Sequence, residues 1–545
     1  MTDQVPGDDP DAVGLVTPAT LADWLGDGAE LALLDAREQG VFFHGHLFHA
    51  ACVPLSHLEL DLPRLVPRRA VRTVWCDDGV GDLAARAANR SADLGWSNVS
   101  ILDGGVAGWA DSGREVYSGV NVPSKAFGES VEHRFATPCV SAGDLKQMLD
   151  DGTDLVILDA RPIDEFRRMS IPTGTDCPGA ELVHRVKQVV TDPGTLVVVN
   201  CAGRTRSIIG CQSLINAGLE NRVVALENGT MGWELAGYDV DRDRDEHAPD
   251  PGPHARAWAG AAAQRVGRRF GVQHIDHDEL AEMVADGDRT TCLLDVRTPD
   301  EFGSGHLPGS RSAPGGQLVQ ATDEYVATRH ARLVLIDDDG VRATMTASWL
   351  RQLGWSDAVV LDRALDGRDL EVDRAPRRED TRTPSTTAQA IRVSELAERL
   401  DEVGLVVLDI GTSLKYRDRG HIPGAWWGVR SRLDAARATI GDVATIVLAS
   451  TDGRLAELAI DDARRCWPDA DVLALTGGTR SWRHAGCLME SGFARPTTEP
   501  DDVWYKPYDH AGGVAVDHMN DYLSWEIALV DQIERDPTVE FPTFT

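Results

Sequence analysis

The chain has 545 residues, a hydrophobic content of 42% and a formal net charge of −33 at pH 7. This length exceeds what one hydrophobic core usually supports, so we expect roughly three to five domains. The negative charge disfavours nucleic acid and anionic membranes as partners, because their phosphates would be repelled, although it permits a local basic pocket.

The nine cysteines are scattered without paired or regular spacing. This distribution favours neither a zinc site nor a disulfide framework, and it is typical of the reducing cytoplasm. We therefore predict no metal and no cofactor. Residues 1–11 are acidic and lack the apolar segment of a signal peptide, and no apolar run has the length of a membrane span. The sequence predicts a soluble, cytoplasmic protein.

The predicted elements repeat four times along the chain. In each repeat an apolar strand ends in an acidic residue and a polar turn follows. The four acidic residues are Asp35, Asp159, Asp295 and Asp409. A second apolar strand then runs into a loop, and in three repeats a glycine-containing segment comes last. These segments end at Trp109, Trp233 and Trp482. Self-similarity at this long period predicts that each repeat builds its own core.

Short β-branched runs alternate with helix-like segments inside each repeat. This alternation predicts an α/β fold in which a parallel sheet is flanked by helices. Polar, proline-containing stretches at 117–137, 241–253 and 373–387 are expected linkers. In the tail, 516–534 has the apolar spacing of an amphipathic helix, which we expect to dock on the same chain. The four predicted domains and the C-terminal tail cover 13–118, 135–243, 270–375, 388–495 and 500–545.

Cys201 is the residue that points most directly to chemistry. It ends an apolar strand, and a loop with Gly203, Arg204 and Arg206 leads from it into a predicted helix. A thiol at a helix N-terminus lies near free N–H groups and the positive end of the helix dipole, which both favour the reactive thiolate. A buried structural cysteine is the alternative interpretation, and the two arginines make it the less favoured one.

Together these motifs resemble the rhodanese family of sulfurtransferases, arranged as four tandem rhodanese-like domains. The resemblance rests on the Asp-x-Arg…Glu-Phe segment, the Gly-His-Ile/Leu-Pro-Gly turn, the Cys-x4-Arg-Ser loop and the Gly-Gly-x-x-x-Trp end. It implies that Cys201 takes a sulfane sulfur from an anionic donor such as thiosulfate and forms a persulfide. A thiol, cyanide or a protein cysteine would then collect the sulfur.

The resemblance also implies which residues bind the donor. The loop residues concerned are Ala202, Gly203, Arg204, Thr205, Arg206 and Ser207. Arg206 is expected to hold the anionic end of the donor, since a guanidinium suits an oxyanion. We expect Asp159 and Arg161 to form a buried structural pair beside the site. The stretch around Lys125 has two interpretations, a packed linker or a segment that adds positive charge near the active site.

The other three units differ at the position of the nucleophile. We expect Cys76 at this position in the first unit, Asp338 in the third and Ser450 in the fourth. Two aspartates follow Cys76 and would raise its pKa, while an aspartate or a serine cannot hold a sulfane sulfur. The sequence thus predicts one catalytic unit, the second, and three inactive units. We also expect a chain that ends after Ala248 to keep forming the persulfide.

Two other functions stay open at this point. Cysteine-loop phosphatases and arsenate reductases place one residue more between cysteine and arginine than the four that separate Cys201 from Arg206. A non-enzymatic scaffold or sensor is the second alternative, because three units lack a plausible nucleophilic loop. Among donors, thiosulfate, 3-mercaptopyruvate and glutathione persulfide all carry an anion, and the paired arginines favour thiosulfate or a persulfide.

Overall fold

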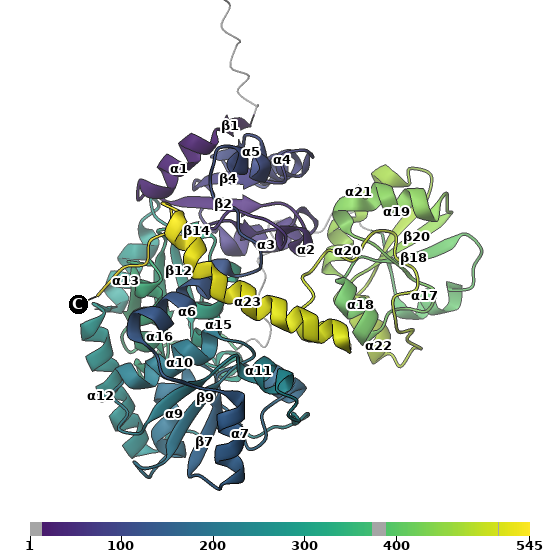
Figure 1. The fold of residues 1–545 in the computed structure, drawn as a ribbon. Coiled ribbons are helices and arrows are strands. Elements are labelled where there is room, and N and C mark those ends of the chain that lie inside the picture. Colours follow the sequence, from purple (N-terminus) through teal and green to yellow (C-terminus); the bar gives the residue numbers. More distant parts are fainter. Residues whose placement is uncertain (1–12, 373–388, 511, 545) are drawn as a thin grey trace, which may run out of the picture.

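The computed structural model describes residues 13–372, 389–510 and 512–544. These residues form four sheets, and each sheet takes five parallel strands from one of the four sequence repeats (Figure 1). In every repeat the strands are ordered first, fifth, fourth, second and third across the sheet. This shared topology confirms the predicted α/β fold of parallel sheets flanked by helices. The predicted linker 373–387 lies outside the described residues.

The first two repeats have the same succession of strands and helices. The first consists of β1 (Gly14–Val16), α1 (Pro18–Gly26), β2 (Leu31–Asp35), α2 (Gln39–Phe42), β3 (Ala51–Cys52), η1 (Leu55–His57), α3 (Leu58–Leu65), β4 (Arg72–Cys76), α4 (Leu83–Asp93), β5 (Val99–Leu102) and α5 (Gly105–Asp111). The second consists of β6 (Cys139–Val140), α7 (Ala142–Asp150), β7 (Leu155–Asp159), α8 (Ile163–Arg168), β8 (Thr175–Asp176), α9 (Glu181–Val189), β9 (Leu196–Asn200), α10 (Thr205–Asn216), β10 (Val223–Leu226) and α11 (Gly229–Leu235).

The third and fourth repeats follow the same plan. The third consists of β11 (Gln273–Ile275), α13 (His277–Ala285), β12 (Thr291–Asp295), α14 (Pro299–Ser304), β13 (Arg311–Ser312), α15 (Gly315–Gln320), η2 (Thr322–Glu324), β14 (Thr328–Arg329), β15 (Arg332–Ile336), α16 (Val341–Gln352) and β16 (Ala358–Leu361). The fourth consists of β17 (Ala390–Ile391), α17 (Val393–Arg399), β18 (Leu405–Asp409), α18 (Ser413–Arg419), β19 (Trp426–Trp427), η3 (Arg430–Arg432), α19 (Leu433–Ile440), β20 (Thr445–Ala449), α20 (Arg454–Leu458), α21 (Ile460–Cys466), β21 (Asp471–Leu475) and α22 (Gly478–His484).

The central strands are largely apolar because helices cover both faces of each sheet. In β9, all five residues are buried, and four of them are leucine or valine. Continuous β-branched runs of this kind are typical of strands in the middle of a parallel sheet. Strand β9 is the third of five in its sheet, so the residue after it emerges at the centre of the carboxyl edge.

Two helices connect the repeats, and neither is a passive spacer. Helix α6 (Val122–Phe135) lies within the predicted linker 117–137, and α12 (Pro253–Arg269) follows the second repeat. One apolar core joins α9 and α12 to α16 of the third unit. A second core joins Phe127 of α6 and Ile208 of α10 to Leu318 of α15. The second and third units therefore share their hydrophobic interior.

The C-terminal tail docks within the chain, as predicted. It forms η4 (Pro507–Asp509) and α23 (Gly513–Arg535), which runs across the molecule in Figure 1. Helix α23 packs along α6 and contacts α11, and its Met519 and Leu523 join a core cluster with Ala202 of the Cys201 loop. Burial of this apolar face fixes the tail against the second unit.

The units are also linked through a shared sheet edge and through buried ion pairs. Strand β14 of the third unit pairs antiparallel with β2 of the first unit, a pairing that local sequence patterns do not predict. Arg430 of the fourth unit binds Glu59 of the first unit at 2.7 Å. Among the described residues, no helix is long and apolar enough to cross a membrane.

The register of the sheets corrects the predicted position of the nucleophile in two units. The four acidic strand ends pair with Cys76, Asn200, Ile336 and Ala449. The residues equivalent to Cys201 are therefore Asp77, Asp337 and Ser450. The predicted position is one residue too early in the first unit, where Cys76 is the last residue of its strand. It is one residue too late in the third unit, where Asp338 lies one step into the loop. The error arose because apolar runs alone do not define hydrogen-bond register.

Candidate functional site

Cys201 lies at the carboxyl edge of the second sheet, between β9 and the start of α10. Its carbonyl oxygen accepts hydrogen bonds from the N–H of Thr230 at 2.8 Å and from the Thr230 hydroxyl at 3.0 Å. The loop is thus fastened to the first turn of α11. Cys201 is 2% exposed, and its Sγ atom lies 3.3 Å from Oγ of Ser207.

The structure explains why the segment that ends at Trp233 contains a glycine at position 229. Its φ is 55°, and a Cβ atom there would lie 2.4 Å from the carbonyl oxygen of Cys201. The same close approach occurs at Gly105 and Gly478, whose Cβ atoms would crowd the carbonyls of Asp77 and Ser450. A glycine is required here because α11 must approach the loop backbone and because L residues disfavour this φ.

The N-terminus of the helix after the loop forms an anion-binding cradle in the first and third units. In the third unit, Asp337 accepts hydrogen bonds from the N–H groups of Gly340 at 2.7 Å and Ala343 at 3.0 Å. In the first unit, Asp77 accepts from Gly79 and Ala84 at 2.8 and 2.9 Å. A side-chain carboxylate thus occupies the cradle in both units. In the second unit Cys201 occupies the equivalent position in the register of the sheet, and its Sγ atom contacts Oγ of Ser207.

Arg204 holds the loop to α6. Its guanidinium binds both oxygens of Glu129 at 2.7 Å and also pairs with Glu132. Glu129 is 1% exposed, and Arg204 is 8% exposed. Two carboxylates therefore balance the charge of this arginine, which the sequence alone placed as a donor-binding group.

Arg206 lies in a second ion pair. It donates to Glu165 at 2.8 and 3.2 Å and to the side-chain oxygen of Gln317, from the third unit, at 3.0 Å. Burial alone would raise the pKa of Glu165, but Arg206 outweighs it and holds that pKa at about 2. The same pair recurs as Glu301 and Arg342 in the third unit, at 2.8 Å.

Lys125 of α6 also reaches the site. It is 8% exposed, its Nζ atom lies 3.5 Å from Oε1 of Glu526, and it lies 5.6 Å from the ring centre of Tyr522. Burial disfavours its charged form, but Tyr522 and Glu526 raise the pKa of Lys125 above its usual range. Glu526 is fully buried and accepts a hydrogen bond from the Thr205 hydroxyl at 2.5 Å.

These groups surround a cavity of about 180 Å³ with Cys201 in its wall. All the predicted loop residues from Ala202 to Arg206 line it. Ser207 is not part of the wall, and its Oγ atom contacts the sulfur of Cys201. Other parts of the chain complete the wall. They contribute Lys125 from α6, Gln317 from the third unit, and Trp504, Tyr508 and Tyr522 from the tail.

The aromatic residues of the tail form one side of the cavity wall. The rings of Trp504 and Tyr522 stack at 5.8 Å, and Phe43 of the first unit stacks on Trp504 at 5.4 Å. The sequence did not reveal Gln317, Tyr522 or Glu526 as site residues, because they lie more than a hundred residues from Cys201. The sequence does contain a signal for Glu165, because a glutamate and an arginine 41 residues apart occur in both the second and the third unit.

Asp159 and Arg161 lie next to the loop but outside the cavity wall. They form a buried ion pair of 2.7 Å, and the Asn200 amide donates to Asp159 at 2.8 Å. Equivalent pairs occur at Asp35 with Arg37 and at Asp295 with Arg297. The pair therefore also occurs beside Asp77 and Asp337, in units that have no cysteine at the position of Cys201.

The other cysteines near the sheets lie in less favourable surroundings. Burial raises the pKa of the Cys76 thiol, and the charge of Asp35 adds to this effect. Burial also raises the pKa of Cys211 to about 12. Neither environment favours a thiolate.

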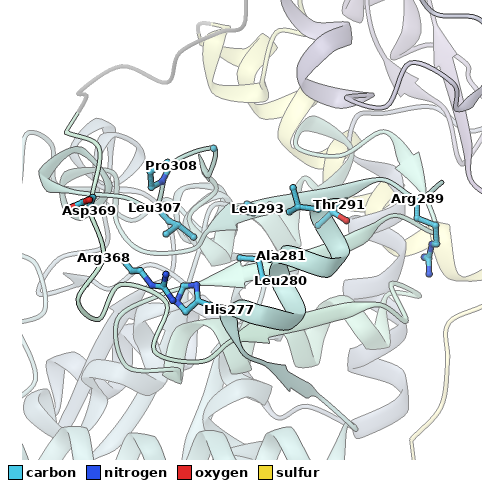
Figure 2. A pocket seen from close by; sticks show the side chains of 12 residues that line it. His277, Leu280, Ala281, Arg289, Thr291, Leu293, Leu307, Pro308, Arg368 and Asp369 are labelled. Carbon is cyan, nitrogen blue, oxygen red and sulfur yellow. The ribbon is translucent and has the colours of Figure 1, made fainter. Parts of the chain in front are cut away.

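A larger cavity of about 630 Å³ lies on the third unit (Figure 2). Its wall includes Leu280 of α13, Leu293 of β12 and Leu307, with Arg289 and Arg368 at its edges. None of the residues that line it is a cysteine, so this cavity offers no thiol for covalent chemistry. The smaller cavity at Cys201 is the better candidate site.

Comparisons with known proteins agree with the repeated architecture. The rhodanese-like domain family matches residues 17–112, 141–236 and 276–367. The crystal structure of a thiosulfate sulfurtransferase from Pseudomonas aeruginosa is 45% identical, covers 98% of this chain and all of that chain, and superposes with a TM-score of 0.93.

A curated relative matches a shorter region. The probable adenylyltransferase/sulfurtransferase MoeZ of Mycobacterium tuberculosis strain H37Rv is 34% identical over 97 residues. This match covers 17% of the present chain and 24% of MoeZ, and the MoeZ of strain CDC 1551 matches equally. The chain thus spans about a quarter of the length of these curated relatives.

Proposed function

This chain belongs to the rhodanese family of sulfurtransferases, and we propose that it moves a sulfane sulfur from thiosulfate, or a related small anionic donor, to a thiophilic acceptor through a persulfide on Cys201. The observation that carries this proposal is the position of Cys201. It is a cysteine at the loop position where the other units have Asp77, Asp337 and Ser450, and it lies in the wall of a cavity.

In the proposed first step, the Cys201 thiolate attacks the outer sulfur of thiosulfate. A bond forms between Sγ and that sulfur, the sulfur–sulfonate bond breaks, and sulfite leaves with the electron pair. The persulfide that remains is an anion. The cradle suits it, because the equivalent N–H groups bind carboxylates in the first and third units.

In the second step, a nucleophilic acceptor attacks the outer sulfur of the persulfide and regenerates the Cys201 thiolate. Cyanide, a thiol or a protein cysteine has the required chemistry. Since Cys201 is 2% exposed, small acceptors reach its sulfur more easily than a protein cysteine does.

The size of the cavity favours a small donor. Its volume of about 180 Å³ lies below the roughly 300–1,000 Å³ of pockets that hold drug-sized ligands. Thiosulfate is a compact tetrahedral anion, whereas glutathione persulfide carries a tripeptide. We propose that the two arginines hold the loop, with Arg206 also directing N–H groups to the donor.

Mass spectrometry of the intact protein tests the proposal. After treatment with thiosulfate, the protein should gain one sulfur atom, and cyanide should remove it. Cys201→Ser should gain none, while the control Cys76→Ser should behave like the wild type. An adduct that persists in Cys201→Ser would assign the chemistry elsewhere. A wild-type protein without any adduct would favour the scaffold or phosphatase alternatives.

A further inference from the structure

Three cationic side chains reach the Cys201 cavity from largely buried positions, and they differ in how tightly they are paired. Arg204 and Arg206 each bind a carboxylate through two nitrogen–oxygen contacts. The carboxylate next to Lys125 is farther away, with Oε1 of Glu526 at 3.5 Å. Lys125 is therefore the least tightly paired of the three.

The pair between Arg206 and Glu165 is not specific to the catalytic unit. The third unit keeps the same pair between Arg342 and Glu301, yet it has Asp337 where the nucleophile would be. The pair is thus a feature of the fold in both units. A carboxylate at 2.8 Å also neutralises much of the charge that Arg206 could offer to an anion.

The structure brings Lys125 to the loop through close contacts between three elements. Gly128 of α6 packs against Thr205, where an added Cβ would lie 2.8 Å from a side-chain carbon. On the other side, an added Cβ at Gly203 would lie 3.3 Å from the Tyr522 ring. Helix α23 thus presses Tyr522 and Glu526 against the loop, and Lys125 lies beside both.

We infer that Lys125 binds the anionic sulfonate end of the sulfur donor and makes the site select dianionic over monoanionic donors, with Tyr522 and Glu526 as positioning residues. Its role in turnover rests on the proposed persulfide chemistry of Cys201. When sulfite leaves, the charge of the donor stays on the sulfonate group, so a cation there serves the bound donor and the leaving group alike. Exclusion of water by the tail strengthens this interaction.

Binding and turnover of two donors test the inference. Thiosulfate is a dianion, and methanethiosulfonate has a methyl group in place of one charged oxygen. Calorimetry on Cys201→Ala measures binding without reaction, and single-turnover persulfide formation by the Cys201 protein measures chemistry. With Lys125→Met added, we expect thiosulfate binding to weaken roughly tenfold or more, as for loss of a charged hydrogen bond. Methanethiosulfonate binding should weaken by no more than about threefold.

Matched variants separate this effect from general charge loss. Lys146→Met removes an exposed lysine of α7 that pairs with Asp150, and it should leave both donors unaffected. Lys506→Met removes the exposed lysine of the cavity rim, whose charge is screened by water, and it should change the preference for thiosulfate far less than Lys125→Met does. Lys125→Arg should recover most of the preference for thiosulfate. If Lys125→Met leaves Glu526 uncompensated and fails to fold, Lys125→Met with Glu526→Gln removes both charges together and should show the same loss of preference.

The outcomes distinguish the two proposals. Equal losses for both donors, or no loss in Lys125→Met, would overturn the role of Lys125 even if the wild type forms its persulfide. Thiosulfate binding that depends on Lys125, in a protein that never forms a persulfide, would support the anion site and overturn the sulfurtransferase function.

Discussion

At the scale of single residues, the ion pair between Arg206 and Glu165 should contribute both to the stability of the fold and to activity. The equivalent pair in the third unit allows the two contributions to be measured separately. We expect Arg206→Ala to lower catalytic efficiency roughly ten- to a hundredfold, because the loop loses a buried charged contact beside Cys201. It should also destabilise the fold by about 3–5 kcal/mol, since Glu165 is left without its partner. Arg342→Ala removes the matching arginine of the third unit and should reduce stability without slowing persulfide formation. Thiosulfate kinetics and urea unfolding measure both effects. Full efficiency in Arg206→Ala would show that neither donor binding nor the loop geometry depends on this arginine.

Asp176 gives the second prediction at this scale, and it concerns pH. Burial raises the pKa of Asp176 from 3.8 to about 8, with the charge of Asp159 adding to the shift, and one of its carboxylate oxygens has no hydrogen-bond partner. Between about pH 4 and 8, the folded state therefore keeps a proton that the unfolded chain has already lost. Stability from this group is present below pH 4 and falls as pH rises through that window. Asp176→Asn cannot ionise, so its free energy of unfolding relative to the wild type should rise steadily from pH 4 to 8. The exposed Asp164→Asn should show a constant difference. A flat difference for Asp176→Asn in urea titrations would contradict the shifted pKa.

At the scale of elements, the contact between α11 and the loop before α10 sets the geometry of the cradle. Gly229→Ala and Gly237→Ala introduce the same methyl group at glycines with φ of 55° and 82°, so both should cost about 1–2 kcal/mol from backbone strain. Only the first places a Cβ against the carbonyl of Cys201, whereas Gly237 has open space around it. We expect Gly229→Ala to slow persulfide formation at least tenfold and Gly237→Ala to leave the rate unchanged. Single-turnover assays measure these rates. Equal rates in the two variants would mean that the loop tolerates displacement by the added methyl group.

At the scale of the whole molecule, the active site depends on parts of the chain that are far from Cys201 in sequence. A chain that ends after Ala248 lacks Gln317, α23 and the apolar surface that covers Ile208 and Ile209 of α10. We therefore expect it to form the persulfide at least tenfold more slowly than the full chain, a difference of about 1.4 kcal/mol in the barrier. This expectation differs from the one drawn from sequence, in which the second unit suffices. Persulfide formation at the full-length rate, in a truncated chain shown to be folded by circular dichroism, would restore that simpler view.

The amino-acid sequence by itself determined the repeated α/β fold and singled out Cys201, because both leave local signals: apolar strands at regular intervals, and a cysteine between a strand and a helix. It also predicted the amphipathic tail helix, whose apolar spacing is local. The local sequence patterns did not define the strand register, so Cys76 and Asp338 were misplaced by one residue. Only the tertiary structure decided that Glu129 and Glu165 neutralise the two arginines and that Lys125, Gln317 and Tyr522 complete the cavity. These groups meet only when helices from distant parts of the chain pack together, and their pairing depends on distances that no local pattern encodes.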